Sequence, residues 1–311
     1  MRIDILTLFP DAVEASLKIS ILGRAEKKGI LDIHAVQIRD YTENKQQQVD
    51  DYPYGGGWGC VMMAQPLKSC LDDVCAKAGE KRRRVIYMSP QGKTFDQSCA
   101  RRLAADYDHL VLVCGHYEGV DERFIEECVD EEISLGDFVL TGGEIAAMAV
   151  TDAVCRLIPG VLADEECFTG ESHWDGLLEY PQYTRPDMWE GREVPPILRS
   201  GVDREIARWR RKKMLERTMD KRPELFEKFV PQTDEDKALL DEIDAERHPR
   251  PVPPKIDCRR AEEADLPTIL GIADEAKAFL ASQGLDQWQH GYPAEEDFRR
   301  DIERGDGWLF T

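Results

Sequence analysis

The first 160 residues alternate between short apolar runs and longer stretches with helical periodicity. The apolar runs are rich in β-branched residues and have the length of strands buried on both faces; they lie at 3–9, 31–38, 84–89 and 110–115. Between them, apolar positions in 66–78 and 96–107 recur with the 3.6-residue period of a helix. This alternation predicts an α/β fold with a mostly parallel sheet and helices on its faces.

The stretch SLGDFVLTGGE, Ser134 to Glu144, looks like a short buried strand that is closed by glycines and runs into an apolar helix. Thr141 and Glu144 have the spacing of a capping box, in which each side chain satisfies a free backbone N–H. Pro159 and Gly160 are expected to end the helix. The glycines match neither G-x-G-x-x-G nor G-x-x-x-x-G-K-[ST], so neither nucleotide motif explains them.

Three glycine-bearing loops, 89–96, 114–123 and 135–144, follow predicted strands. Ligands of open parallel sheets bind outside the C-terminal strand ends, so these loops are expected to converge there. Any one of them alone is equally consistent with an ordinary turn. None combines a lysine with the row of backbone N–H groups that a phosphate requires. The expected ligand is therefore a nucleoside-like molecule.

Two further features of the first half allow alternatives. The glycine run 50–62, DDYPYGGGWGCVM, is either a flexible hairpin loop or a backbone surface that a large flat group approaches closely. His116, beside Tyr117 and Glu118, is either catalytic or structural.

The segment 161–187 lacks periodicity and is rich in Gly and Pro, which is typical of a lid or a linker. It contains four carboxylates that are either solubilising charges or include a general base facing Arg156: Glu165, Glu166, Glu171 and Asp175.

The charge distribution matters more than the total. A net charge of -20 alone argues against a nucleic-acid partner. Half of that excess lies in 231–311, which holds 20 acidic and 10 basic residues. The predicted helix 203–222 holds nine basic residues against four acidic ones. It is either a solvated helix face or a surface for nucleic-acid phosphates.

The remaining composition indicates a cytosolic protein. No apolar run is long enough to span a membrane, and the N-terminal stretch, with its early Asp4, does not resemble a secretory signal. Nine scattered cysteines without a C-x-x-C pair indicate reduced thiols and give no zinc-binding pattern. A proline-rich linker at 248–255 precedes a strand–turn–helix pattern in 256–311.

Seven motifs, in this order and at this spacing, resemble the bacterial tRNA (guanine-N1)-methyltransferases of the TrmD type, in the SPOUT class. They are DDYPYGGGWGCVM, YMSPQGKTFD, VCGHYEGVDER, ISLGDFVLTGGE, DAVCRLIPGVL, GLLEYPQYTRP and WRRKKMLERT. The resemblance covers about residues 1–247. It implies methylation by S-adenosylmethionine of N1 of guanosine 37, next to the anticodon of tRNA.

The resemblance also implies the architecture. A deep trefoil knot is expected in the sheet domain, as an exception to the rule that chains do not thread loops. An obligate homodimer is expected, with active sites at the subunit interface. The expected parts are a knotted cofactor-binding domain at 1–160, an interdomain loop at 161–185, a helical tRNA-binding domain at 186–247, the linker at 248–255 and an appendage at 256–311.

The family's cofactor contacts fall on the three strand-end loops. By resemblance, S-adenosylmethionine contacts Tyr87, Ser89, Pro90, Gln91, Gly92, Gly115, Tyr117, Glu118, Gly119, Ser134, Leu135, Gly136, Asp137, Phe138, Val139, Leu140, Thr141, Gly142 and Gly143. A neutral adenosine and a sulfonium agree with the lack of a phosphate-binding lysine. The basic helix is expected to contact tRNA phosphates through Arg208, Arg211 and Lys212.

The expected chemistry needs a base and a cation. N1 of guanine carries a proton that a base must remove, and the negative charge that shifts to O6 must be stabilised. The family's arginine falls on Arg156 and its presumed catalytic aspartate on Glu171, with Asp175 as the alternative base. Glu171 and Cys167 depart from the usual Asp and Ser. The family depends on Mg²⁺, which could assist the O6 charge, although the sequence shows no metal-ligand cluster.

The appendage resembles the beginning of a GNAT-type acetyltransferase without the loop that binds the acetyl-CoA pyrophosphate, so acetyl transfer is not expected. Two alternatives from other classes stay open. A catalytically inactive RNA-binding module would bind the cofactor without turnover. An acetyltransferase would bind acetyl-CoA.

Overall fold

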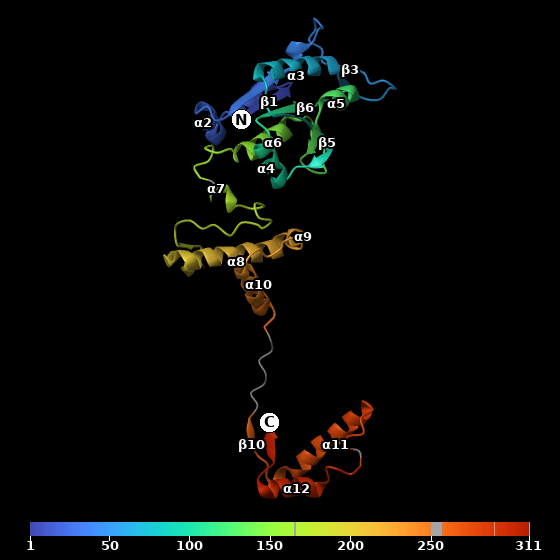
Figure 1. Ribbon diagram of the computed structural model, residues 1–311, viewed down its shortest axis with the longest axis vertical. Coiled ribbons are helices and arrows are strands. Elements are labelled where there is room, and N and C mark those ends of the chain that lie inside the picture. The colour runs from blue at the N-terminus through green and yellow to red at the C-terminus, as the bar shows by residue number, and fades with distance from the viewer. Residues whose placement is uncertain (165, 250–256, 289, 311) are drawn as a thin grey trace. The chain divides into compact units, whose positions relative to one another are not determined.

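The structure of the chain is a computed structural model that describes residues 1–164, 166–249, 257–288 and 290–310. The chain forms two compact units (Figure 1). The first is Met1–Leu240, and the second begins at Asp241, within the helix α10 (Asp234–Arg247). Of the proline-rich linker, 250–255 lies outside the described residues.

A five-stranded parallel sheet in the order β2-β1-β6-β5-β7 forms the centre of the first unit. Its strands are β1 (Arg2–Thr7), β2 (Asp32–Gln37), β5 (Arg83–Thr94), β6 (His109–Cys114) and β7 (Glu131–Ser134). The predicted parallel sheet and its four apolar runs are therefore confirmed. β5 is longer than predicted, because the chain leaves the ladder after Met88 and resumes pairing at Lys93, with both residues opposite Ile133.

The strand predicted within Ser134–Glu144 is wrong in its position. β7 ends at Ser134, and the segment that follows it makes no ladder. Phe138 and Val139 are 55% and 81% exposed, so this apolar run does not pack into the core of the unit. Its apolar residues resemble a buried strand in sequence, but the strand that pairs with β5 consists of the more polar residues just before them.

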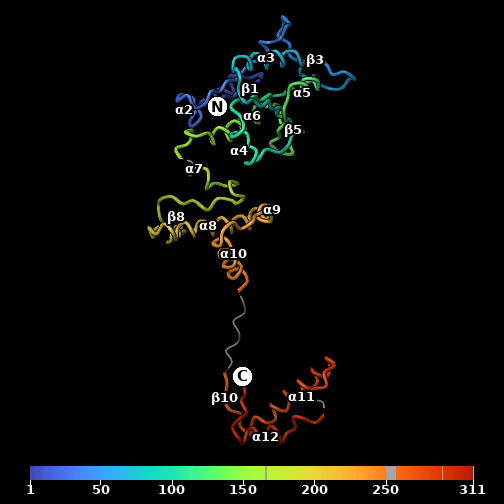
Figure 2. The backbone as a smooth tube through the Cα atoms, viewed as in Figure 1, coloured from blue at the N-terminus to red at the C-terminus, as the bar shows by residue number. Residues whose placement is uncertain are grey.

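Alternating strand residues supply two cores, one on each face of the sheet. On β6, Leu110 and Leu112 belong to one core and Val111 and Val113 to the other. The first core is covered by α1 (Pro10–Leu17), α2 (Ser20–Lys27), α4 (Gln97–Asp106) and α6 (Glu144–Cys155). The second is covered by η1 (Ile38–Tyr41), α3 (Ala64–Ala78) and α5 (Glu122–Cys128). Figure 2 shows the chain passing from one face to the other.

Shorter elements complete the first unit. The glycine run forms a hairpin between β3 (Asp50–Asp51) and β4 (Val61–Met62). After α6 come α7 (Glu166–Thr169), β8 (Met188–Trp189), β9 (Arg192–Glu193) and η2 (Pro196–Arg199). The helices α8 (Asp203–Lys221), α9 (Pro223–Phe226) and α10 follow.

The second unit has the predicted strand–turn–helix order. It contains β10 (Cys258–Arg260), η3 (Glu263–Asp265), α11 (Leu266–Ser282), α12 (Glu295–Arg304) and β11 (Trp308–Phe310). β10 and β11 pair antiparallel. Across the described residues of both units, no helix combines the length and hydrophobicity needed to cross a bilayer.

Candidate functional site

The segment 89–92 within β5 and the loops that follow β6 and β7 meet at one end of the sheet, because parallel strands place their carboxyl ends on the same side. They enclose a pocket with a mixed polar and apolar lining. The lining residues are Tyr87, Met88, Ser89, Pro90, Gly115, Ile133, Ser134, Leu135, Phe138, Leu140, Gly142, Gly143 and Ala146. The predicted convergence of the three loops is therefore present.

The pocket contains about half of the residues expected from the resemblance. Those placed in the same loops but outside its lining are Gln91, Gly92, Tyr117, Glu118, Gly119, Gly136, Asp137, Val139 and Thr141. Met88, Ile133 and Ala146 line the pocket but were missed. Their position at strand ends and in the first turn of α6 was the available signal, but apolar core residues look the same in sequence.

Glycines allow the loops to approach one another closely. A Cβ on Gly143 would lie 2.7 Å from the Cα of Cys114, and one on Gly92 would lie 2.4 Å from the backbone of Glu132. The N–H of Gly143 donates to the carbonyl of Gly115 at 3.0 Å. These glycines therefore serve backbone-to-backbone packing around the pocket.

The capping box predicted for α6 is wrong. Gly143 is the N-cap and makes no side-chain cap bond. The Glu144 carboxylate instead accepts a hydrogen bond from the Thr7 hydroxyl at 2.6 Å and lies 2.8 Å from Nε2 of His116. A tertiary partner competes successfully with the local cap, which sequence spacing cannot reveal. His116 is thus paired with Glu144.

Arg156, the C-cap residue of α6, forms a two-point ion pair with Glu171. Its Nη2 lies 2.9 Å from Oε1 of Glu171, and its Nη1 bonds the other carboxylate oxygen. The hydrogen bond from Arg156 lowers the pKa of Glu171 below its ordinary value, and partial burial opposes this effect. The arginine and the carboxylate predicted to work together are therefore in direct contact.

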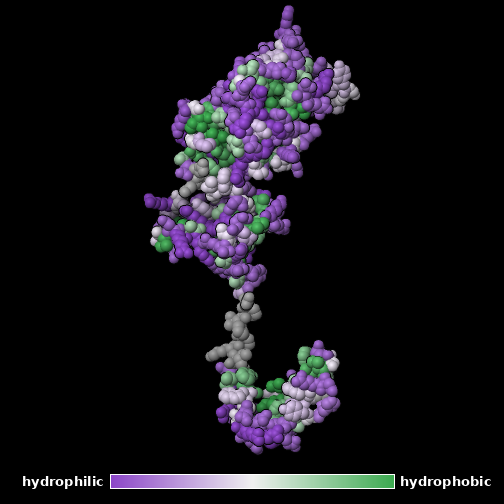
Figure 3. All heavy atoms as spheres, in the orientation of Figure 1, coloured by the Kyte–Doolittle hydropathy of each residue, from purple (hydrophilic) through white to green (hydrophobic). Residues whose placement is uncertain are grey.

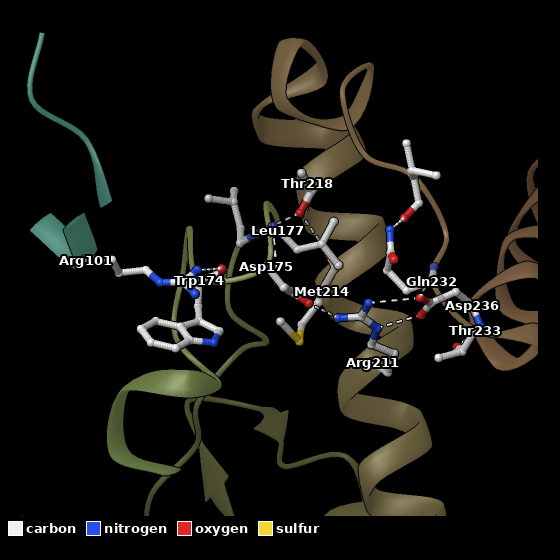
Figure 4. Close-up of polar contacts among 12 residues, drawn as sticks. Arg101, Trp174, Asp175, Leu177, Arg211, Met214, Thr218, Gln232, Thr233 and Asp236 are labelled. Atoms are coloured by element: carbon white, nitrogen blue, oxygen red, sulfur yellow. Dashed lines mark hydrogen bonds and ion pairs between the residues drawn. The ribbon is translucent and has the colours of Figure 1, made fainter. Parts of the chain in front are cut away.

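Asp175 belongs to a different set of contacts, shown in Figure 4. Arg211 of α8 bonds Asp175 and also Asp236, the latter through Nε at 2.7 Å and Nη2 at 3.1 Å. Hydrogen bonding by Arg211 lowers the pKa of Asp236, whose side chain is 1% exposed. Arg211 therefore links the loop to α8 and α10, besides any contact with RNA.

The other predicted residues are placed as follows. Arg208 is exposed and Lys212 is half-buried on α8, and both make contacts within the protein. Glu165 lies outside the described residues, and Glu166 begins α7. In the part of the chain that the structure describes, no three His, Cys, Asp or Glu side chains form a group able to hold a metal ion.

A parallel sheet with helices on both faces and a strand-end pocket lined by uncharged residues defines an α/β protein, in which an arginine–carboxylate pair lies at the far end of the helix that leaves the pocket. The model of the family described as tRNA (Guanine-1)-methyltransferase TrmD matches residues 1–228. The chain belongs to this family, as its motifs predicted. The matched residues all lie in the first unit.

Curated relatives agree with this assignment. The chain is similar to the tRNA (guanine-N(1)-)-methyltransferase of Ruminiclostridium cellulolyticum, with 53% identity over 229 residues, 74% of this chain and 97% of that protein. The protein of the same name from Alkaliphilus oremlandii is 49% identical over 251 residues, which cover 79% of this chain and all of that protein. That from Clostridium acetobutylicum is 50% identical over 242 residues, 78% and 97% of the two chains.

Proposed function

We propose that this chain transfers a methyl group from S-adenosylmethionine to N1 of guanosine 37 in tRNA. The observation that carries the proposal is the contact between Arg156 and Glu171 in a member of this family. S-adenosylmethionine, when bound, supplies an electrophilic methyl group. The chain must then supply a base for the N1 proton and a cation for O6, and these two residues provide both.

The three-loop pocket suits this cofactor. Its apolar lining residues, among them Leu135, Phe138 and Leu140, fit the faces of an adenine, while backbone groups of the glycine-rich loops offer hydrogen bonds to its edge. Among the described residues, no lysine lines the pocket, in agreement with a ligand that has no phosphate.

The length of α6 supports a homodimer with shared active sites. Gly143 at the pocket and Arg156 are separated by the 12-residue helix, which rises about 18 Å at 1.5 Å per residue. The pocket and the ion pair of one chain therefore lie too far apart to act on one base. A second copy that presents its Arg156 and Glu171 to the pocket of the first resolves this separation.

The surface beside the pocket is suited to such a partner. Ile19 and Ile145 are 63% and 58% exposed, and with Leu17, Ile21 and Met148 they line an apolar groove between α2 and α6. In Figure 3 hydrophobic side chains gather over this part of the first unit. Burial of this surface against a second copy would be favourable.

The ion pair has a direct consequence for the mechanism. Arg156 keeps Glu171 ionised while the two are paired, and it also keeps the carboxylate a weak base. When a guanine enters, its O6 competes for the guanidinium and its N1–H faces the carboxylate. The loss of the arginine partner raises the pKa of Glu171 as the proton is about to be removed. The base therefore becomes stronger only with the substrate in place.

Glu171 keeps the carboxylate of the family's aspartate but has one more methylene, and nothing in the geometry of the pair prevents it from acting as the base. Asp175 is the second candidate, although it is tied to Arg211. The alternative function, an RNA-binding module without activity, would follow only if neither carboxylate supported turnover.

In the proposed function, residues 1–160 bind the cofactor, 161–185 form the catalytic segment and 186–247 bind tRNA. Arg208 and Lys212 of α8 are the proposed phosphate contacts, and Arg211 contributes less because two carboxylates already bond it. The linker at 248–255 and the appendage at 256–311 have no assigned part in the reaction.

Three further parts of the proposal come from the family. A deep trefoil knot is proposed from membership of the family. A cytoplasmic location is supported by nine free cysteines and a tRNA substrate. Mg²⁺ is proposed as an accessory ion, but the described residues form no site for it, so no step is assigned to a metal.

One assay tests the activity. The protein is incubated with labelled S-adenosylmethionine and a tRNA transcript that carries G at position 37, and with the same transcript in which that G is replaced. Transfer to the first transcript alone supports the proposal. Cofactor binding without transfer to either would establish the inactive RNA-binding module instead.

A further inference from the structure

Trp174 lies within the segment that carries both candidate bases, three residues after Glu171 and next to Asp175. Its ring packs between two side chains. The guanidinium of Arg101 lies 4.3 Å from the ring centroid, and the ring of Phe168 lies 5.0 Å away at a tilt of 53°. Nη1 of Arg101 also donates to the backbone carbonyl of Trp174 at 3.4 Å. Figure 4 shows the arginine reaching from α4 to the indole.

The surface below the indole is apolar and belongs to the sheet domain. Trp174 and Phe168 close a pocket whose other walls come from α4 and from the residues just after α6: Arg101, Ala104, Ala105, Leu157, Ile158 and Pro159. The indole is half-buried there. The segment is thus seated on the sheet domain through two aromatic rings in addition to the ion pair of Glu171.

Two ion pairs also connect the segment to different places. Glu171 is bonded by Arg156 beside the sheet, and Asp175 by Arg211 on α8. The Arg156–Glu171 pair is bidentate, whereas the Asp175 carboxylate is paired to α8. An aromatic ring under a guanidinium on an apolar surface adds a contact of comparable strength that depends on neither carboxylate. The indole contact is therefore a second anchor on the sheet side, beside the Arg156–Glu171 pair.

We propose that Trp174, held by Arg101, is a positioning residue that seats the segment Phe168–Leu177 on α4 and thereby keeps Glu171 within reach of Arg156. This inference rests on the function proposed above. Glu171 and Trp174 are joined in one turn by the bond from the N–H of Trp174 to the carbonyl of Glu171 at 3.4 Å. A shift of the indole therefore moves the carboxylate with it.

The expected effect is on the methyl-transfer step. A misplacement of about 1 Å at a reacting group can cost on the order of 10²-fold in rate. Trp174→Ala should therefore lower the single-turnover rate at saturating tRNA by about 10-fold to 100-fold. The affinity for S-adenosylmethionine should stay the same, because Trp174 lines a different pocket from the cofactor's.

Matched variants separate positioning from general damage. Trp174→Phe keeps a ring over the apolar surface and Arg101→Lys keeps a cation, so both should recover part of the rate. Arg101→Ala should resemble Trp174→Ala. Arg102→Ala is the control, because it removes the next arginine of α4, which pairs with Glu131 and not with the segment. It should leave the rate unchanged.

Hydrogen exchange supplies a readout that does not depend on activity. The N–H of His173 donates to the carbonyl of Leu177 at 2.8 Å, and that of Glu179 to the Ser172 hydroxyl at 3.0 Å. These amides should exchange faster in Trp174→Ala and Arg101→Ala, and at the wild-type rate in Arg102→Ala.

Two results would overturn the inference: wild-type exchange in both Trp174→Ala and Arg101→Ala, or faster exchange with an unchanged transfer rate. If the wild-type protein itself transfers no methyl group, the proposed function fails instead. The exchange experiment then still decides whether Trp174 seats the segment.

Discussion

At the scale of single residues, the proposed chemistry depends on the ion pair between Arg156 and Glu171. The two residues are 15 positions apart and approach only because the chain turns back beyond α6. The carboxylate is ionised and bonded before any substrate arrives, so its removal should affect the transfer step more than binding.

Glu171→Gln should lower the single-turnover rate at saturating tRNA by about 10²–10⁴-fold, the usual contribution of a positioned base. Cofactor affinity should be nearly unchanged. Asp175→Asn is the comparison and should lose much less, because that carboxylate faces α8. If Asp175→Asn is the inactive variant and Glu171→Gln the active one, the two roles must be exchanged.

Gly142 gives a second prediction at this scale. A Cβ there would lie 2.3 Å from Cε1 of His116 and 2.7 Å from Oε2 of Glu144. Gly142→Val should therefore displace the turn that lines the pocket and abolish S-adenosylmethionine binding while the protein still folds. Calorimetry measures the affinity and circular dichroism the fold, and an unchanged affinity would mean that this turn does not line the cofactor site.

At the scale of elements, hydrophobic periodicity correctly predicted the strands whose formation depends on burial alone. The runs at 84–89 and 110–115 became β5 and β6 because apolar residues on both faces can only be buried in the middle of such a sheet. The run at 138–140 failed the same rule because its residues belong to a loop beside the strand-end pocket. The contacts of Trp174 and Arg211 were not predictable, since they join residues distant in sequence.

The basic helix α8 gives a prediction about tRNA binding. Replacing Arg208 and Lys212 by Gln should weaken tRNA binding and flatten its salt dependence. The slope of log affinity against log salt should fall by roughly 0.7–0.9 for each phosphate that is no longer neutralised. Filter binding across a range of salt concentrations measures this slope. A slope equal to that of the wild type would leave α8 as a solvated face.

At the scale of the whole molecule, the 12-residue α6 separates the pocket from the Arg156–Glu171 pair within one chain. A site built from two copies can be tested by mixing variants, each of which damages a different half. Gly142→Val removes the pocket, and Glu171→Gln removes the base.

A mixed dimer of these two variants contains one site with both halves intact and one with neither. Random exchange of subunits should therefore restore about a quarter of the wild-type activity from two inactive proteins. Unfolding and refolding the variants together, with each alone as the control, measures this recovery. No recovery in a mixture shown to contain mixed dimers would place the pocket and the base of each site in the same chain.

The hydrogen bonds around the pocket also indicate which of its loops can move to admit a ligand. The segment 89–92 within β5 is held at both ends, because Met88 and Lys93 both pair with Ile133. The loop Gly115–Gly119 is bonded to the hairpin through Cys60 and Met62. Among the described residues, the bonds made by 135–141 stay within Ser134–Phe138, and the loop is tied to Gly115 through the N–H of Gly143. The stretch between these two points has the fewest bonds to the other two loops, so we expect it to be the gate. Addition of S-adenosylmethionine should then slow hydrogen exchange most at 135–141. Equal slowing in all three loops would mean that no single loop acts as the gate.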